Sequence, residues 1–430
     1  MLAHGVGQLG DLPLPLWQFT WAATAALAVS FVALGTLWQQ PRLADGAAGH
    51  PLGWTRGVLR LAEPVARIAS FTLFLLVLAA GLFGVDESGD NINPVTIYVL
   101  FWVVLQTLVC IVGDIWRVLS PFDTIAIGFE RRRRDPPGVA PAWSPWVAPV
   151  GAGAFLFMEL IHPSGDSPRL LAMAMVIYTA VMLVGAWQWG RSWLAQGETA
   201  ALLFGLLSAM APLTRDDRGR LRVRPPMSGL ATLDTTPAQT ATLLVVLGGV
   251  TFDGFGESPL WRDLVGRHTG WEDAGVRFVG LVASTAIVAA LYLAAVRSMA
   301  AITRQQPRHL ANTFAPSLIP IVFGYTLAHY LQLAIDETQS FWFRLSDPFG
   351  RGWDLFGRAG GSVNFDVISF DALAWTQALA IVIGHIAGVI VAHDRAVALF
   401  DERDALRSQY VMLLVMVLYS VLGLWLLLNA

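Results

Sequence analysis

Residues 409–428 read QYVMLLVMVLYSVLGLWLLL, an uncharged apolar run of about the 20 residues that an α-helix needs to cross a bilayer. Nine further stretches of the chain repeat this pattern. The ten are Leu16–Trp38, Val65–Gly84, Pro94–Gly113, Trp146–Ile161, Arg169–Gly190, Pro237–Phe252, Val276–Val296, Ala311–Ile335, Asp371–Ala392 and Gln409–Leu428. They predict an all-α fold: a polytopic membrane helix bundle of about ten transmembrane helices, with residues 1–430 forming a single integral-membrane domain.

The composition supports a membrane protein and argues against nucleic acid as a partner. Hydrophobic residues make up 55% of the chain and charged residues only 14%, whereas soluble domains carry about 25% charged residues. The net charge is −3, and no basic stripe lies outside the loops. All 28 basic residues are Arg, a usage typical of a GC-rich bacterial genome. The lone Cys110 excludes a disulfide framework, and we interpret it as a small core residue.

The arginines divide unequally between alternate loops, which predicts the orientation. One set of loops holds 21 of them and the other holds seven. The seven are Arg169, Arg262, Arg267, Arg277, Arg344, Arg351 and Arg358. Because arginine-rich loops stay in the cytoplasm, the pattern predicts a bacterial plasma-membrane protein with both termini outside.

The same distribution limits the number of crossings. Leu202–Leu213 is apolar, but counting it as a span would move every later arginine-rich loop outside. We therefore interpret it as an interfacial helix or a partial re-entrant segment. A second interfacial helix is predicted at Ile115–Phe129. Both lie in predicted cytoplasmic loops, at residues 114–145 and 191–236.

The eighth stretch carries the richest set of polar groups at membrane depth. Tyr325, His329, Gln332 and Asp336 are spaced to share one helix face, and prolines 316 and 320 below them should bend the helix. Ionisable groups are expensive inside a bilayer and usually face a cavity or a partner. This face is therefore a candidate catalytic site with Tyr325, His329 and Asp336, the alternative being that His329 only hydrogen-bonds a neighbouring helix.

The ninth stretch supplies a second buried histidine. His385 lies between Gly384 and Gly388, a spacing that allows close helix approach and places the imidazole in protein rather than lipid. It is a candidate cofactor ligand, although it should lie about 12 Å deeper than His329, at ~1.5 Å per helical residue. That offset argues against one haem held by both rings. His393 is interpreted as a solvated or salt-bridged helix end.

Carboxylates and imidazoles also gather at the predicted outer boundary. His329, Asp253, Glu159 and His4 could together bind a divalent metal, zinc or copper, which would activate a bound water. His4 follows Met1–Ala3, which resembles the tail of a signal sequence, so the true start could lie upstream and His4 could be the mature N-terminus. The alternative is that these acidic groups are merely solvated at helix ends.

The longest predicted outer loop, residues 336–370, is rich in aromatic residues. Phe341–Phe356 holds most of them. This composition is typical of an aromatic belt in the headgroup layer. The alternative is a lid over an apolar ligand that enters from the membrane.

Several motifs in this order resemble those of bacterial integral-membrane proteins known as fenitrothion hydrolases. The motifs are His4-Gly5 with Asp11-Leu12-Pro13, Asp114-Ile115-Trp116-Arg117 with Ser120-Pro121, Thr251-Phe252-Asp253-Gly254, Ala328-His329-Tyr330, Asp347 through Gly357, and Gly384-His385 through Arg395. The resemblance extends over nearly the whole chain. It implies hydrolysis of an organophosphate triester at the membrane, without implying particular catalytic residues.

Two functional hypotheses follow from the sequence. The first is a membrane-embedded hydrolase with an outward-facing site, in which His329 and Asp336, aided by Glu159 and Asp253, bind a metal or act as base on an apolar organophosphate-type ester. The second is a transporter, a metal- or haem-handling protein, or a subunit of a membrane complex, without hydrolytic turnover. The lipid bilayer is the partner that both hypotheses require.

Overall fold

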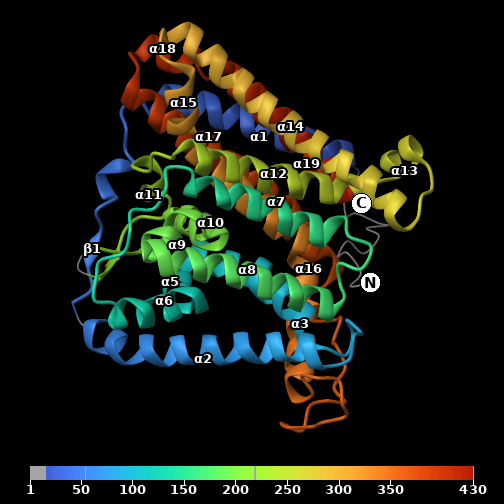
Figure 1. Cartoon of the computed structure of the whole chain (residues 1–430). Coiled ribbons are helices and arrows are strands. Elements are labelled where there is room, and N and C mark those ends of the chain that lie inside the picture. The colour runs from blue at the N-terminus through green and yellow to red at the C-terminus, as the bar shows by residue number, and fades with distance from the viewer. Residues whose placement is uncertain (1–15, 54, 217–218, 430) are drawn as a thin grey trace.

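The computed structural model describes residues 16–53, 55–216 and 219–429, and these form a bundle built almost wholly of helices (Figure 1). The first half contains α1 Leu16–Leu37, α2 Thr55–Phe83, α3 Ile92–Pro94, the π-helix η2 Val95–Leu105, α4 Gln106–Val112, α5 Trp116–Leu119, α6 Pro121–Arg132, α7 Val147–Leu160, α8 Pro168–Trp189, α9 Arg191–Gly197 and α10 Thr199–Leu207. The second half contains α11 Ser228–Ala231, α12 Pro237–Glu257, α13 Pro259–Val265, α14 Gly270–Thr303, α15 Pro307–Phe314, α16 Ile319–Ser346, α17 Phe370–Leu399, α18 Glu402–Arg407 and α19 Tyr410–Asn429. Short 3-10 turns are η1 Ala44–Gly46, η3 Ser144–Trp146, η4 Ser208–Met210 and η5 Ala315–Leu318.

Each of the ten predicted apolar stretches is helical. Within the described residues, eight segments are long and apolar enough to cross a membrane. The two stretches outside these eight are α7, which has 14 residues, and α1, which is apolar and has 22. The helical membrane bundle is thus confirmed in outline, and the count of ten crossings stays a prediction.

The short elements collect at the two ends of the bundle. Figure 1 shows α5, α6, α9 and α11 at one end and α13 at the other, where α1 also begins and α19 finishes. The first end coincides with the arginine-rich loops, so we call it the inner end and the opposite one the outer end.

The inner end also holds a small β-sheet that the all-α prediction missed. Strands β1 His50–Pro51, β3 Leu221–Val223 and β2 Leu213–Arg215 pair in that order, all antiparallel. Each strand has only two or three residues, too few for an alternating pattern to be recognised in the sequence.

The first predicted interfacial helix is placed differently from expectation. α10 covers much of Leu202–Leu213, and Leu203, Phe204 and Leu207 are fully buried in the main hydrophobic core. An interfacial helix would keep one apolar face in lipid, so the burial of α10 argues against that interpretation, and the re-entrant alternative stays a prediction. The Ile115–Phe129 segment forms α5 and α6. Asp123 of α6 is joined to Arg67 and Arg191 at 3.0 and 2.6 Å.

The eighth stretch is broken where the prolines predicted a bend. α15 is separated from α16 by the 3-10 turn η5, which contains Pro316, and Pro320 follows in the first turn of α16. Pro320 cannot donate a backbone hydrogen bond, so the regular ladder ends there. α16 then packs tightly on α17. A Cβ at Gly384 would lie 2.7 Å from the Pro320 carbonyl oxygen and 3.2 Å from the Gly324 Cα.

α16 continues ten residues beyond Asp336, so the predicted outer loop 336–370 is shorter than expected. It begins at Asp347, whose carboxylate accepts hydrogen bonds from the backbone N–H groups of Arg351 and Gly352 at 2.9 and 2.6 Å. Leu355 and Phe356 remain about 60% exposed (59% and 64%). Both the belt and the lid interpretation stay predictions.

Candidate functional site

The candidate site forms where α12 crosses α16 and α7 in the outer half of the bundle. α12 begins with a capping box, in which the Thr236 hydroxyl accepts from the Gln239 N–H and the Gln239 amide oxygen accepts from the Thr236 N–H. It ends at Glu257 because Pro259 follows and forces Ser258 into an extended conformation. Fifteen of its residues are buried, including Asp253. The helix therefore carries a carboxylate into the protein interior.

Asp253 meets His329 of α16. The His329 Nε2 atom lies 2.9 Å from Asp253 Oδ2, and the two side chains are 4% and 1% exposed. At this depth the contact between the imidazole and the carboxylate stabilises both groups, because an isolated buried charge costs several kcal/mol. The predicted pair of His329 and Asp253 is therefore brought together directly.

Tyr330 joins the pair to a second carboxylate. Its hydroxyl lies 2.5 Å from Asp253 Oδ2 and 3.3 Å from Glu159 Oε1 of α7. Tyr330 is 3% exposed. The prediction missed it because it is the next residue after His329 and so points away from the Tyr325–Asp336 face. The Ala328-His329-Tyr330 motif was the signal that could have identified it.

Glu159, Tyr330, Asp253 and His329 together form what we call the outer cluster. Its hydrogen bonds need one proton more than the Tyr330 hydroxyl supplies. A phenol has one proton, so Tyr330 can donate to only one carboxylate. The 2.5 Å contact assigns that proton to Asp253. The Glu159 contact at 3.3 Å is then a hydrogen bond only if Glu159 is protonated and donates to the phenol oxygen. Its other oxygen, Oε2, is buried and has no hydrogen-bond partner among the described residues.

Tyr325 lies one helical turn inward of His329 and belongs to the same neighbourhood. Its ring stacks on the His329 ring, with centroids 6.4 Å apart. A Cβ at Gly254 would lie 3.1 Å from the Tyr325 hydroxyl, and one at Gly423 of α19 would lie 3.3 Å from its ring. Glycine at both positions therefore lets α12 and α19 close around this tyrosine.

Asp336, the third predicted catalytic residue, is not brought to the cluster. It lies seven residues beyond His329, about 10 Å along the helix at ~1.5 Å per residue. Its side chain interacts with Gln332 and is partly exposed. The structure therefore places Asp336 on the same helix face as His329 but about two turns away from it, and a catalytic role for Asp336 stays a prediction.

The predicted metal ligands are only partly assembled. Among the described residues, no three His, Cys, Asp or Glu side chains lie close enough to hold a metal ion. His329 and Asp253 are in contact, whereas Glu159 is linked to them through a phenol rather than through a shared centre. His4 lies outside the described residues. The metal site and the choice of zinc or copper stay predictions.

His385, the predicted cofactor ligand, is held inside the bundle. Its Nδ1 lies 2.8 Å from the Ile381 carbonyl oxygen, and the residue is 1% exposed. The ring faces Tyr419 of α19, with centroids 6.0 Å apart. Its role toward a cofactor stays a prediction.

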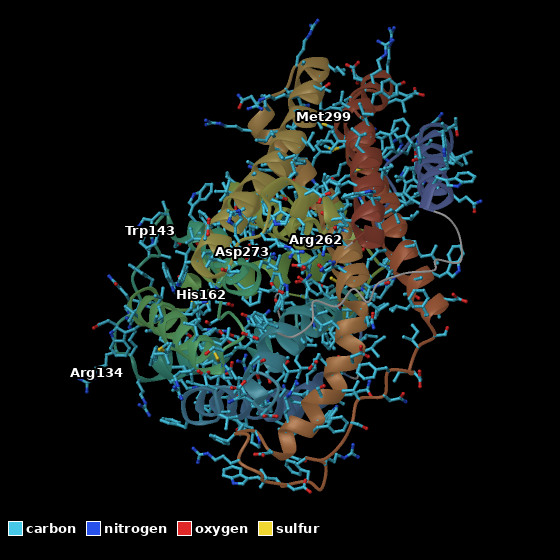
Figure 2. The ribbon with its side chains drawn as sticks, turned by 90° about the vertical axis from the view of Figure 1, so that its right-hand side faces the viewer. Arg134, Trp143, His162, Arg262, Asp273 and Met299 are labelled. Carbon is cyan, nitrogen blue, oxygen red and sulfur yellow. The ribbon has the colours of Figure 1, made fainter. Side chains whose placement is uncertain are left out.

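Charged side chains surround the outer end of the cluster. Arg277 donates to the Leu160 carbonyl at 2.9 Å and pairs with Glu257 at 3.1 Å, so it connects α14 to the ends of α7 and α12. Figure 2 looks onto this end, where His162, Arg262 and Asp273 lie around the helix ends. The cluster therefore lies beneath a polar rim at the outer end of the bundle.

No family model, curated protein or solved structure matches this chain.

Proposed function

We propose that this multi-pass membrane protein is a transport protein that exchanges protons at the outer cluster. The observation that carries the proposal is the single Asp253 oxygen shared by His329 and Tyr330, with Glu159 on the far side of the phenol. Acids linked in series by a hydroxyl are suited to passing a proton. Intramembrane ionisable groups are typical of proton relays in pumps and transporters.

The proposed relay moves one proton without leaving a net change in Tyr330. Protonated Glu159 gives its proton to the Tyr330 oxygen while Tyr330 gives its own proton to Asp253. The imidazole of His329 then takes up the proton, leaving Asp253 as the carboxylate that balances the imidazolium charge. Loss of the proton from His329 toward the inner side and return of one proton to Glu159 from the outer rim reset the cluster.

A flux measurement tests this proposal. The purified protein is reconstituted into vesicles containing a pH-sensitive dye, and a potassium diffusion potential drives proton entry. We expect a flux above that of empty vesicles, and we expect Asp253→Asn to reduce it to the empty-vesicle level because the amide cannot be protonated reversibly. Asp371→Asn, at the exposed start of α17 and outside the cluster, is the matched control and should retain the flux. Equal flux from wild-type and Asp253→Asn vesicles would contradict the proposal.

Hydrolysis of an apolar organophosphate ester is the second candidate. It is favoured by the His329–Asp253 contact, since a carboxylate-oriented imidazole is the arrangement of a general base. The resemblance to fenitrothion hydrolases adds the substrate class, a triester that partitions into lipid in a bacterial plasma membrane. Release of nitrophenolate from fenitrothion provides the assay. Under this candidate His329→Ala should abolish turnover without loss of expression, whereas retained turnover would exclude a role for His329.

A further inference from the structure

We infer that His385 is a second proton-binding group, which receives protons from the outer cluster through a line of hydroxyl groups between α12 and α19. The inference rests on the proposed proton exchange and names its inner acceptor. Figure 1 shows α12, α17 and α19 in the upper half of the bundle, with α16 running from them toward α3. These four helices supply every residue of the line.

The hydrogen bonding of His385 leaves one ring nitrogen available. The Ile381 carbonyl can only accept, so the Nδ1 atom 2.8 Å away must carry the proton of the neutral ring. The Nε2 atom is therefore a lone-pair acceptor. It is buried and has no hydrogen-bond partner in the part of the chain that the structure describes. A buried acceptor without a donor is costly, and binding a proton or a donor would remove that cost.

Tyr419, the side chain next to His385, makes a hydroxyl contact with α12. Tyr419, whose ring faces the imidazole, contacts the Thr251 hydroxyl through its own hydroxyl. Thr251 donates to the Leu247 carbonyl at 2.7 Å, so its oxygen is free to accept the Tyr419 proton. The Tyr419 hydroxyl can thus donate its proton to the Thr251 oxygen, and its own oxygen retains lone pairs that can accept a proton.

Helix periodicity connects this contact to the outer cluster. Gly254 follows Thr251 by three residues on α12, and Gly423 follows Tyr419 by four on α19, so each pair shares a helix face. Tyr325 occupies the space against Gly254 and Gly423, which is one turn outward of the Thr251–Tyr419 contact. His329 stacks on Tyr325 from the next turn. The order from outside to inside is therefore His329, Tyr325, Tyr419 and His385.

The proposed transfer is balanced. The His329 imidazolium loses one proton and becomes neutral, while His385 gains one at Nε2 and becomes an imidazolium with both nitrogens protonated. The Tyr325 and Tyr419 hydroxyls each accept one proton and give up another, with water molecules completing the contacts between them.

The charged surroundings of His385 are sparse, so its protonation should respond mainly to the relay. Tyr419 is the titratable side chain in ring contact from α19, while α16 supplies His329 and Tyr325 and α12 supplies Asp253 farther out. The described part of α1 has no charged residue. On α17 itself, the nearest charged or titratable group is His393, eight residues away.

Two measurements on the reconstituted protein test the inference. In the flux assay we expect His385→Gln to reduce proton entry to the empty-vesicle level, and Tyr419→Phe to reduce it while leaving the fold intact. His309→Gln, an exposed histidine on α15, is the matched control and should retain the flux. Loss of flux in Asp253→Asn but not in His385→Gln would overturn this inference and leave the proposed function standing. A wild-type flux no greater than that of empty vesicles would overturn the proposed function itself.

The second measurement does not depend on flux. With ¹⁵N-labelled histidine, solid-state NMR should show His385 as the Nδ1-protonated neutral form at high pH and as the doubly protonated form on acidification. Asp253→Asn should shift that conversion. A His385 signal that keeps one tautomer at every pH down to unfolding would contradict proton binding at this residue, whatever the flux result.

Discussion

Two regions of this protein combine a buried histidine with a buried aspartate, and they satisfy their polar groups in opposite ways. The outer cluster of Glu159, Tyr330, Asp253 and His329 is built from contacts between side chains. His393, Asp394 and Arg395, near the end of α17, form a second group of hydrogen-bonded side chains, which we call the inner knot. Most of its partners are backbone N–H and C=O groups. The difference separates groups that can exchange protons from groups that hold the fold.

The inner knot is saturated with hydrogen bonds. Asp394 Oδ1 accepts from the Trp38 indole and from the backbone N–H groups of Arg42 and Leu43 at 2.9, 2.7 and 3.2 Å. His393 contacts the Trp38 carbonyl at 2.9 Å and the Gln409 amide at 3.2 Å. A separate bond set ties Arg395 to the Leu230 and Leu233 carbonyls and to Asp234. The knot therefore ties the end of α17 to three other parts of the chain.

The first and largest expected effect compares two Asp→Ala substitutions. Asp394→Ala leaves two backbone N–H groups and an indole, all at part-buried positions, without their acceptor. A stranded donor costs roughly 1–3 kcal/mol when buried, so we expect the three together to cost about 3 kcal/mol. Asp253→Ala should cost less, about 1–2 kcal/mol, because His329 can lose its proton and Tyr330 can turn to Glu159.

Thermal unfolding in detergent measures both variants, with Asp371→Ala at the exposed start of α17 as the control. If Asp253→Ala were the more destabilising of the two, the distinction between an exchanging cluster and a structural knot would be lost.

The second prediction concerns the close approach that sets the position of α16. Gly384→Val would force the added side chain against the Pro320 carbonyl and Gly324, and overpacking of this kind costs about 2 kcal/mol. We expect the outer cluster to change more than the inner knot, because His329 and Tyr330 move with α16. Histidine NMR signals report both regions in one sample, and an unchanged His329 signal beside a shifted His393 signal would contradict this expectation.

The third prediction tests whether the Tyr330 hydroxyl connects Glu159 to Asp253. Tyr330→Phe removes the bridging hydroxyl and should cost about 1 kcal/mol, the usual contribution of one hydrogen bond. The carboxylic-acid C=O band of Glu159 should shift in the infrared difference spectrum, because its hydrogen-bond partner is gone. Glu159→Gln identifies that band. A band unaffected by Tyr330→Phe would mean that Glu159 holds its proton without the phenol.

The smallest expected effect is a pH dependence at Glu198, a buried carboxylate outside the candidate spans. It accepts hydrogen bonds from Trp116, Tyr178 and the N–H groups of Ala200 and Ala201, yet burial still raises its pKa. A raised pKa means that the folded state holds this proton more tightly than the unfolded state. The contribution to stability is therefore full below the unfolded value, about 4.3, and falls as pH rises through the folded pKa.

Glu198→Gln should remove that slope from the free energy of unfolding, as measured by urea or thermal unfolding at several pH values. Asp371→Ala again provides a control whose slope should match the wild type. A wild-type stability that rises with pH, with the same slope in Glu198→Gln, would contradict a raised pKa at this carboxyl.

Several features could be predicted from the sequence because they depend on local composition. The apolar stretches, the break at Pro316 and Pro320, and the burial of His329 and His385 follow from hydropathy and backbone chemistry, which act over one helix. The β-sheet and the buried position of α10 could not be predicted this way. A strand of two or three residues and a short apolar helix take their place from neighbours far along the chain.

The sequence by itself determined that this is a membrane helix bundle with polar groups at depth on α12 and α16, because a span must be apolar and any charged group within it is conspicuous. Only the tertiary structure decided which of those groups meet. It paired His329 with Asp253, introduced Tyr330 as the link to Glu159, and left Asp336 about two turns away along α16. Helix periodicity assigns a residue to a face, whereas contact depends on depth and on the neighbouring helix, which are set by packing at positions such as Gly324 and Gly384.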